Sequence, residues 1–460
     1  MPTAKIGRAV IGIAVLAAVL SAALPVDGPG GASAATPGPP SFLQVLTDDQ
    51  TVDSLATMPK TRRLLVRRGT RFTDHNAVQP LCCPSRASFL TGLYPHNHGV
   101  LGNRFPYGFA AMDFSRTIYT ALDGTGYRTG WIGKVLNAEG GAGVAPEPGF
   151  DEWLVPLHAE EGSDMFDYAL SDNGVARELE GSWQNAVYAD RARSFLAAAA
   201  DAGQPFLLTL AVHSPHWSPC PDDIRSRCPP QSPPRDRGSF AGTGYPFGPD
   251  FEGGPAARRT ANRYWRRELE ALRSVDRIVG SLVAELRRAG RLDDTYVIFQ
   301  SDNGMLHGEH GVFDKNVPWD RSVRVPLVIR GPGFGRGAVR RDLTANVDVP
   351  ATILDAAGVT PTLPPDGHSL LGPHRRQVLL LERLVGSPRA SAGPAAHPWL
   401  QLKTATGWAY WRDTVTGREH LYDRARDPYE TRNLARRRPA VAARLERRLD
   451  RIAGCAAPCP

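Results

Sequence analysis

The first two thirds of the chain carry four short apolar runs, at residues 42–46, 128–132, 205–212 and 296–300. None alternates apolar and polar residues, as a strand with one solvent-facing side would. Each is therefore predicted to be a parallel strand covered on both faces. Amphipathic patterns lie between them, the clearest at residues 263–288, where Leu, Ile and Val recur on one face of a predicted helix. Strands that alternate with helices predict a doubly wound α/β domain.

The pattern changes after about residue 375. Three short antiparallel strands and a terminal helix are predicted there, at 378–381, 399–403, 407–412 and 439–452. We therefore divide the chain into a large α/β domain, residues 35–375, and a smaller subdomain of antiparallel sheet plus helix, residues 376–460. Residues 218–260, rich in Pro, Gly, Arg and Asp, are predicted to form a long surface loop.

The amino terminus has the pattern of a secretory signal peptide. Lys5 and Arg8 precede an apolar run at residues 9–24, and Ala32-Ser33-Ala34 offers a small-residue cleavage site. The run is shorter than the roughly 20 residues that a membrane-spanning helix needs. Residues 1–34 are therefore predicted to direct the export of a soluble, secreted protein that has no membrane partner.

Export permits disulfide bonds. Two pairs of cysteines are close enough in sequence to form them: Cys220 with Cys228, and Cys455 with Cys459. The remaining two, Cys82 and Cys83, are adjacent, and neighbours rarely pair because the bridge would be strained. These two cysteines require another explanation.

Composition narrows the class of protein. The chain has 460 residues, of which 42% are hydrophobic, which suits one large core with a smaller partner. This composition excludes collagen, coiled coils and polytopic membrane proteins. The net charge is +7, but it arises from 49 Arg and only 5 Lys spread along the chain. Because no helix-turn-helix, zinc-finger or RNA-recognition pattern accompanies this charge, we interpret it as solvated surface and expect no nucleic-acid partner.

Polar clusters follow each of the four predicted strands. In chain order they are Thr47-Asp48-Asp49, Gly133-Lys134, His213-Ser214-Pro215-His216 and Ser301-Asp302-Asn303. Since ligands of open α/β sheets bind beyond the carboxyl ends of the strands, these side chains are predicted to share one site. Four of these residues, Asp48, Asp49, Asp302 and Asn303, offer only oxygen atoms as metal ligands. Such ligands favour Ca²⁺ or Mg²⁺ over zinc.

Residues 81–92, Leu-Cys-Cys-Pro-Ser-Arg-Ala-Ser-Phe-Leu-Thr-Gly, match the signature C-x-P-S-R-x-x-x-L-T-G. By this motif the chain resembles the formylglycine-dependent sulfatases. Further segments similar to the family's lie at 46–50, 301–304, 314–315 and 421–434. The doubled cysteine and residues 94–98 and 133–137 resemble the branch of N-acetylglucosamine-6-sulfatases and heparan 6-O-endosulfatases. The resemblance implies an alkaline-phosphatase-like fold, which is a large doubly wound, mixed and mostly parallel sheet flanked by helices.

The resemblance also implies how the site would work. Spacing from Pro84 and Arg86 identifies Cys82 as the residue that the formylglycine-generating enzyme converts to Cα-formylglycine. Hydrated to a gem-diol, it would attack sulfur with one hydroxyl and expel sulfate with the help of the other. Cys83 is predicted to be a small buried side chain. The metal, Ca²⁺ or Mg²⁺, would be held by Asp48, Asp49, residue 82, Asp302 and Asn303.

The resemblance to the family, together with the residues themselves, assigns roles to the cationic side chains. Pro84 is a typical first-turn residue, so a helix is predicted to begin there and to run through residue 91. Its amino end would face the sulfate with backbone N–H groups, and Arg86 would hold the nucleophile's oxygens. Lys134 and Lys315 fall at catalytic Lys positions of the family, in a chain that otherwise uses Arg. His216 is predicted to be the general acid for the leaving alcohol.

One position departs from the family pattern. Many sulfatases have G-K-x-H after the second of these strands, and that His is the usual candidate for deprotonating the gem-diol. Here the position is Leu136, which cannot accept a proton, and Asn137 is not a base near neutral pH. We therefore predict His307 as the base, because it lies four residues beyond Asn303, with His98 as second choice.

Together these features predict a secreted sulfatase that hydrolyses a sulfate ester, either of a carbohydrate such as glucosamine 6-sulfate or of an aryl sulfate. Two alternatives stay open. One is a phospho- or phosphonate-ester hydrolase on the same fold, because tetrahedral oxyanions share their geometry. The other is an inactive protein that binds sulfated glycans.

Overall fold

The structure, a computed structural model, describes residues 38–137, 144–157, 164–220, 223–373, 376–386 and 396–459. The predicted signal peptide at residues 1–34 and the predicted domain boundary at residue 375 lie outside this range and stay predictions. Within the described residues, no helix combines the length and the apolar character needed to cross a bilayer.

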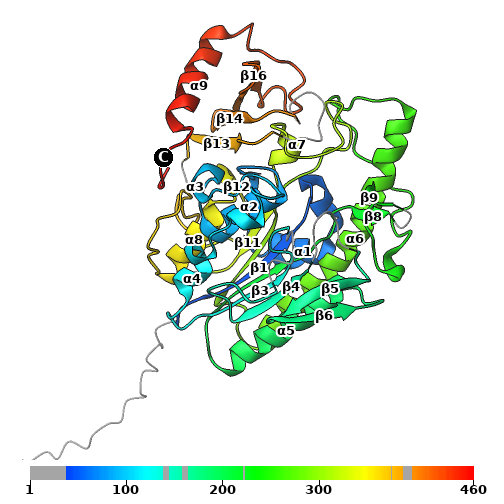
Figure 1. The fold of residues 1–460 in the computed structure, drawn as a ribbon, viewed down its shortest axis with the longest axis vertical. Helices are drawn as coiled ribbons and strands as arrows, with labels where there is room; N and C mark the ends of the chain where they lie inside the picture. Colours follow the sequence, from blue (N-terminus) through cyan, green and yellow to red (C-terminus); the bar gives the residue numbers. More distant parts are fainter. Residues whose placement is uncertain are drawn as a thin grey trace, which may run out of the picture. The chain divides into compact units, whose positions relative to one another are not determined.

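A ten-stranded sheet forms the centre of the fold, in the order β12-β2-β11-β10-β1-β7-β3-β4-β5-β6 (Figure 1). The strands from β10 to β4 are parallel neighbours, and antiparallel pairs follow on both sides. The prediction of a mixed, mostly parallel sheet is confirmed. The strands are β1 (Ser41–Thr47), β2 (Thr70–Asn76), β3 (Arg128–Gly133), β4 (Glu152–Pro156), β5 (Tyr168–Asp172), β6 (Val175–Leu179), β7 (Phe206–Ala211), β10 (Thr295–Ser301), β11 (Leu327–Arg330) and β12 (Ala338–Ala345).

The four strands predicted from apolar runs are the four adjacent strands β10, β1, β7 and β3. On β1, Phe42 lies beside Tyr296 of β10 and Leu207 of β7. Every residue of β1, β7 and β10 is buried, which explains why their sequences are almost continuously apolar. The strands that the patterns did not predict lie farther out in the sheet, and β6, at one edge, is largely exposed.

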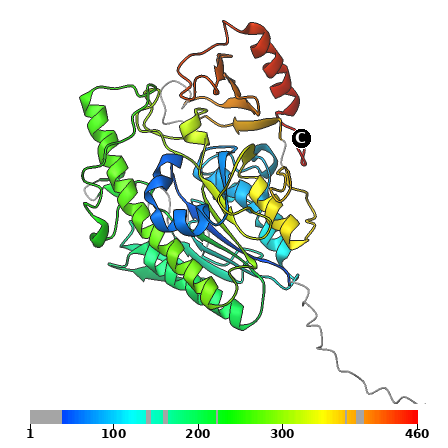
Figure 2. The same ribbon diagram turned by 180° about the vertical axis from the view of Figure 1, so that it is seen from behind.

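Helices cover both faces of this sheet (Figures 1 and 2). Leu43 and Val45 of β1 share a core with the long helices α5 (Gln184–Asp201) and α6 (Pro255–Arg288). Phe42 and Leu46, which point to the opposite face, pack with the helices α2 (Cys82–Thr91), α4 (Ile118–Leu122) and α8 (Asp348–Ala357). The short helices α1 (Pro59–Thr61), α3 (Pro95–His98) and α7 (Asp320–Val323) lie in the connecting segments.

A second sheet has four antiparallel strands in sequence order. They are β13 (Val378–Arg383), β14 (Trp399–Thr404), β15 (Trp408–Asp413) and β16 (Glu419–Asp423). The helix α9 (Pro439–Ile452) packs on this sheet through Ala442, Leu445 and Leu449. The three predicted strands and the terminal helix are confirmed, and β16 was missed. Leu343 and Ala345 of β12 belong to the same core, so the two sheets share apolar packing.

The region predicted as one long surface loop, residues 218–260, contains more structure than expected. β8 (Ser218–Cys220) and β9 (Asp223–Cys228) form an antiparallel hairpin. α6 already begins at Pro255. That prediction was therefore wrong for both ends of the region: Pro219 lies within the short hairpin, and Gly254 and Pro255 mark the start of a long helix. The predicted disulfides, Cys220–Cys228 and Cys455–Cys459, are both present.

We expect the Asp348→Asn substitution to destabilise the fold by about 3–5 kcal/mol, the cost of leaving one member of a buried ion pair uncompensated. Asp348 begins α8, is fully buried, and accepts hydrogen bonds from Arg376 Nη1 at 2.6 Å and Nη2 at 2.7 Å. Denaturant unfolding would measure the loss. The control is Asp190→Asn, which breaks the exposed Asp190–Arg193 pair and should cost less than about 1 kcal/mol. Equal losses in the two variants would contradict the prediction.

Candidate active site

Four neighbouring strands bring the predicted site residues to one edge of the large sheet. Because β10, β1, β7 and β3 are adjacent and parallel, the residues that follow them emerge side by side. Thr47 at the end of β1 lies opposite Ser301 of β10. The backbone N–H of Asp302 donates to Thr47 O at 3.1 Å, which places Asp302 next to Asp48.

The turn at the end of β3 depends on glycine. Gly133 has φ +103°, and a Cβ at this position would collide with the carbonyl oxygen of Ala211 on β7. The backbone N–H of Lys134 donates to that same carbonyl at 2.9 Å. Only glycine permits this close approach without strain, so the Gly-Lys pair places the Lys134 side chain at the sheet edge.

α2 supplies the predicted nucleophile. The helix runs from Cys82 to Thr91, so the predicted helix is confirmed with a start two residues earlier. Cys82 and Arg86 are one turn apart on the same face, with 1% and 0% of their surface exposed. Cys82 Sγ lies 3.5 Å from Asp48 Oδ1 and 2.9 Å from Lys315 Nζ. Side chains from the end of β1 (Asp48) and from the distant segment that carries Lys315 therefore meet at this sulfur of α2.

Asp48 is the centre of a buried ion network. Its Oδ2 accepts a hydrogen bond from Lys134 Nζ at 2.6 Å and lies 3.3 Å from Arg86 Nη2. Arg86 also donates through Nε to Asp302 Oδ2 at 2.8 Å and through Nη1 to the carbonyl of Lys134 at 2.5 Å. Burial would raise the pKa of Asp48, but the surrounding cations, Lys134 first, lower it well below its usual range. Asp48 is therefore ionised. Arg86 contacts two carboxylates and one backbone carbonyl here, and not residue 82 as predicted.

Asp49 forms the other half of the cluster. Its Oδ1 accepts hydrogen bonds from Lys315 Nζ and, at 2.6 Å, from Asn303 Nδ2. Asp49 has φ +65°, in the left-handed region that Asp enters more readily than most residues. Its backbone N–H donates to Asp302 Oδ1 at 3.1 Å, and the N–H of Asn303 donates to the same oxygen at 2.7 Å. This turn keeps the Asp49 carboxylate among the other polar side chains.

The donor set fits a hard divalent cation. One ligand atom each from Asp48, Asp49, Cys82 and His216 lie within 4.8 Å of one another, and all four residues are buried. Asn303 Oδ1 is also buried and has no hydrogen-bond partner among the described residues. A buried amide oxygen without a hydrogen bond destabilises the folded state unless a bound ligand provides its missing partner. Carboxylate and amide oxygens are the ligands that Ca²⁺ and Mg²⁺ prefer.

The two adjacent cysteines have different surroundings. Burial raises the pKa of the Cys82 thiol to about 12, and the Asp48 carboxylate acts in the same direction. An unmodified thiol at this position is protonated near neutral pH and is a weak nucleophile. Cys83 belongs to the apolar core, and its Sγ accepts a hydrogen bond from the backbone N–H of Asn137 at 3.1 Å. The prediction that Cys83 is a small buried side chain is confirmed.

His216 reaches the cluster from the end of β7. Its Nε2 lies 3.6 Å from Asp49 Oδ2, and its Nδ1 lies 2.8 Å from the carbonyl of Trp217, so Nδ1 carries the hydrogen of that contact. Burial lowers the pKa of His216 to about 4, so the ring is neutral here. His213, three residues earlier, lies with Nδ1 2.7 Å from Gln184 Oε1. His216 is thus the histidine that contacts the carboxylates.

His307, the predicted base, lies elsewhere. Its Nε2 is 2.6 Å from Glu268 Oε1 on α6, and its ring packs against Tyr245 and Phe313. Burial would lower the pKa of His307, but Glu268 raises it above its usual value, and the Nε2 atom is engaged by that carboxylate. Closeness in sequence to Asn303 was misleading, because the chain after β10 turns toward α6.

The second choice, His98, has a packing role. Its Nε2 lies 3.2 Å from Ser88 Oγ on α2, and the backbone N–H of Val100 donates to its Nδ1 at 3.1 Å. Burial lowers the pKa of His98 to about 3, so it is neutral. Both ring nitrogens therefore have hydrogen-bond partners, and the Nε2 contact links α3 to α2.

The sequence patterns missed two polar residues that attach α2 to the ends of β10 and β12. Ser85 Oγ donates to the carbonyl of Asp302 at 2.5 Å, and Asn346 Nδ2 donates to Ser85 Oγ at 3.0 Å. Ser85 is part of C-x-P-S-R, so the motif contained a signal for it. Asn346 follows β12, far away in sequence, and no local pattern marks it.

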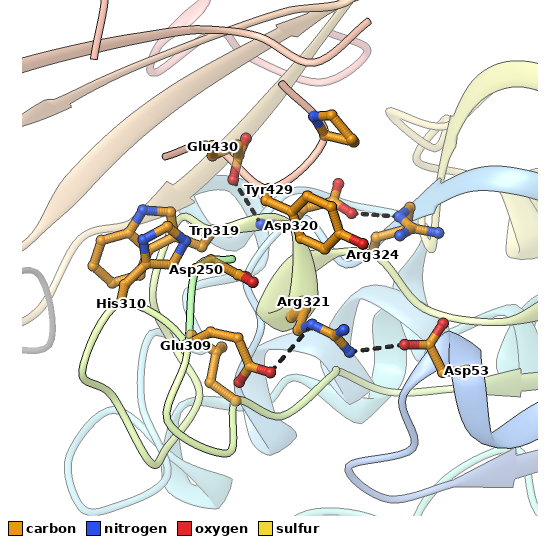
Figure 3. A pocket seen from close by; sticks show the side chains of 12 residues that line it. Asp53, Asp250, Glu309, His310, Trp319, Asp320, Arg321, Arg324, Tyr429 and Glu430 are labelled. Atoms are coloured by element: carbon orange, nitrogen blue, oxygen red, sulfur yellow. Dashed lines mark hydrogen bonds and ion pairs between the residues drawn. The ribbon is translucent and has the colours of Figure 1, made fainter. Parts of the chain in front are cut away.

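A separate cavity of about 190 Å³ lies beside the segment that follows Lys315 (Figure 3). Side chains of the loop after β10, of α7 and of residues 428–430 line it. His310 is among them, and its ring stacks on Trp319 with 4.3 Å between ring centroids. No residue of the Cys82 cluster lines this cavity, so it is distinct from the site described above.

Comparison with curated proteins identifies similar chains. The "Extracellular sulfatase SULF-1 homolog" of Drosophila melanogaster is 32% identical over 72% of this chain and 31% of that protein. The N-acetylglucosamine-6-sulfatase of Homo sapiens is 31% identical over 69% of this chain and 61% of that protein. The chain therefore spans less than two thirds of the length of either relative.

Solved structures share the fold. One, of a protein in complex with its substrate D-glucosamine-2-N,6-O-disulfate, has a TM-score of 0.73 at 24% identity and covers 90% of this chain and 96% of that chain. The phosphonate monoester hydrolase from Silicibacter pomeroyi has a TM-score of 0.68 at 22% identity, covering 91% of this chain and 96% of that chain. At these identities the likeness concerns the fold.

The match to a protein family covers most of the large sheet and its helices. Residues 41–359 match the family described as Sulfatase. This span contains every residue of the cluster around Cys82, including Asp48 at its start and Lys315 near its end. The chain therefore belongs to the sulfatase family, as the C-x-P-S-R motif predicted.

Proposed function

We propose that this chain hydrolyses sulfate esters of carbohydrates, with residue 82 as the nucleophile. The observation that supports this most is the place of Cys82, at the amino end of α2, with Lys315 Nζ 2.9 Å from its sulfur and Asp48 beside it. A sulfate ester at this point would meet the positive end of the α2 dipole and the ammonium groups of Lys134 and Lys315. These surroundings favour a tetrahedral oxyanion over a neutral substrate.

Conversion of Cys82 to Cα-formylglycine would replace a protonated thiol by a hydrated aldehyde, which supplies an oxygen nucleophile. In the unconverted chain, Cys82 Sγ stands at the place of that oxygen, within reach of Lys315. Since Cys82 is 1% exposed, the formylglycine-generating enzyme would have to act before this part of the chain folds. Arg86 would hold Asp48 and Asp302 in position beside the nucleophile.

A divalent cation, Ca²⁺ or Mg²⁺, completes the proposal and would offset negative charge on the ester and the nucleophile. Its ligands would come from an oxygen of residue 82 and from Asp48, Asp49, Asp302 and Asn303. Two findings support part of this set: ligand atoms of Asp48, Asp49 and Cys82 converge within 4.8 Å, together with one of His216, and the buried Asn303 Oδ1 has no hydrogen-bond partner among the described residues.

Two lysines and one histidine would act on the substrate. Burial would lower the pKa of Lys134 and of Lys315, but Asp48 raises that of Lys134 and Asp49 raises that of Lys315 well above its usual value. Both ammonium groups therefore stay charged and can stabilise ester oxygens as compact point charges. We keep His216 as the proposed general acid for the leaving alcohol; because its ring is neutral with the hydrogen on Nδ1, it would first have to take up a proton at Nε2, the nitrogen that lies near the Asp49 carboxylate.

The relatives support a substrate class and a compartment. One relative is named N-acetylglucosamine-6-sulfatase, so we propose a 6-sulfated glucosamine residue as the substrate. Two relatives are named extracellular sulfatases, which agrees with the export pattern of residues 1–34. We accordingly propose that the protein acts outside the cell, with no membrane or nucleic-acid partner.

A second candidate is a phosphonate-ester hydrolase, favoured by the fold shared with the enzyme from Silicibacter pomeroyi. Parallel assays with an aryl sulfate, an aryl phosphate and an aryl phosphonate separate the two, and turnover of only the phosphorus esters would overturn the sulfatase proposal. An inactive glycan-binding protein would retain a thiol at residue 82. Mass analysis of the tryptic peptide that contains this residue decides that point.

We expect Cys82→Ala to lower kcat/KM for an aryl sulfate by at least about 10³-fold, because the nucleophile is removed. The matched control, Cys83→Ala, should retain most activity, since Cys83 lies in the apolar core. It should cost only about 1–2 kcal/mol of stability for the small cavity. Steady-state kinetics and thermal unfolding measure both effects. Equal activity losses in two folded variants would refute the assignment of Cys82.

We expect chelation by EDTA to abolish turnover and added Ca²⁺ or Mg²⁺ to restore it, because the carboxylates need a cation to bring an anionic ester close. Asp302→Ala should lose both bound metal and activity, by about 10³-fold in kcat/KM. Asp53→Asn is the control, since Asp53 pairs with Arg321 away from Cys82. Metal content is measured by mass spectrometry of the purified proteins, and full activity in metal-stripped protein would overturn the site.

A further inference from the structure

Lys315 lies on a segment with little regular structure of its own. Residues 314–319, between β10 and α7, form bends outside any helix or strand. Yet Lys315 Nζ lies 2.9 Å from Cys82 Sγ and donates a hydrogen bond to Asp49. Side chains at reacting centres have to be held within about 0.5 Å. Some other part of the fold must therefore hold this segment in place.

The second sheet supplies the missing support. On β14, Trp399 Nε1 donates to the carbonyl of Asn316 at 3.3 Å, and Gln401 Nε2 donates to the carbonyl of Pro318 at 2.8 Å. Lys403 Nζ, two residues further, donates to Asp320 Oδ1 at 2.9 Å. Donors at 399, 401 and 403 thus face acceptors at 316, 318 and 320. Alternate residues of a strand share one face, so this face of β14 lies along the segment that follows Lys315.

The end of the segment is held from a second direction. Glu430 Oε2 accepts a hydrogen bond from the backbone N–H of Asp320 at 2.9 Å, at the start of α7 (Figure 3). Arg324 donates to the Asp320 carboxylate at 2.5 Å, as Figure 3 also shows. At the other end, the N–H of Asn316 donates to the carbonyl of Pro80, two residues before α2. The segment is therefore fixed at both ends and along its middle.

The supporting side chains are buried although they are polar. Gln401 and Lys403 are each 0% exposed. Gln401 Oε1 has no hydrogen-bond partner among the described residues, which makes the amide more costly to bury than an apolar side chain of the same size. Packing alone would favour Leu or Met at this position. The polar amide is consistent with a requirement for the hydrogen bond to Pro318.

We propose that Gln401 is a positioning residue that acts through Lys315. It holds the carbonyl of Pro318, three residues beyond Lys315, and so sets where the ammonium group meets residue 82 and Asp49. The second sheet is accordingly part of the machinery of the site. The effect on turnover rests on the proposed sulfatase function, whereas the effect on the position of Lys315 does not.

The test is the Gln401→Met variant, which keeps the volume and removes the donor. We expect kcat for an aryl sulfate to fall about tenfold or more, because a misplacement on the order of 1 Å at a reacting centre has effects of this size. The matched control is Tyr410→Phe on the neighbouring strand β15, which loses the 2.6 Å hydrogen bond to Glu419. It should lower stability by a similar amount, about 1 kcal/mol, and leave kcat unchanged.

A double-mutant cycle separates positioning from general stability. In a Lys315→Ala background, Gln401→Met should change kcat by less than about twofold, because the group it positions is absent. A purely structural role would lower kcat by the same factor in both backgrounds and would overturn the proposal, as would wild-type kcat in Gln401→Met.

Crystal structures of the wild type and of Gln401→Met decide the same question without activity. In the variant we expect Lys315 Nζ to lie beyond hydrogen-bond distance of residue 82 and Asp49. An unchanged Lys315 would overturn the positioning role. A wild-type protein that hydrolyses no sulfate ester would instead overturn the proposed function and leave this structural comparison to decide the role of Gln401.

Discussion

The rest of the site depends on the buried ion pairs of the Asp48 carboxylate with Lys134 and Arg86. A carboxylate with no exposed surface is costly to ionise unless cations reach it, and here Lys134 from β3 and Arg86 from α2 both do. Arg86 continues to Asp302, so β1, β10, β3 and α2 are joined through one set of charges. The order of the strands makes this possible, because three of these four elements are parallel strands that end at the same edge. Loss of one partner would leave the others uncompensated in a dry interior.

The parts of the fold that sequence patterns predicted are those with a simple physical cause. The central strands are covered on both faces, so their apolar runs are continuous, and the carboxyl ends of parallel strands collect polar residues. β6 has no such run because its side chains are largely exposed. His307 was misassigned because a sequence offset of four residues from Asn303 does not tell which way the loop turns. Its partner, Glu268, lies on α6, far away in sequence.

The role of β14 was beyond prediction for a related reason. Its sequence alternates Leu400 and Leu402 with Gln401 and Lys403, and this pattern predicts a strand with one apolar and one solvated face. In the structure the polar face is also covered, by residues 316–320. Both faces are therefore interfaces: Leu402 packs in the core that includes α9, and Gln401 meets the Lys315 segment. The sequence of one strand shows which of its side chains are polar, but it does not show which distant segment accepts their hydrogen bonds.

Arg86 makes different contacts from Lys134 and Lys315 because a guanidinium and an ammonium group differ in shape. Arg86 uses its planar fork in three directions: Nε to Asp302, Nη2 to Asp48 and Nη1 to the carbonyl of residue 134. The three donors of a lysine share one nitrogen, so a lysine could not span acceptors as widely separated as these. Lys134 and Lys315 instead each direct a single ammonium group toward the centre of the cluster, where a guanidinium would fill the space next to Cys82. At this site the two lysines thus place compact charges beside Cys82, and the arginine bridges two carboxylates, in a chain that has 49 Arg and 5 Lys.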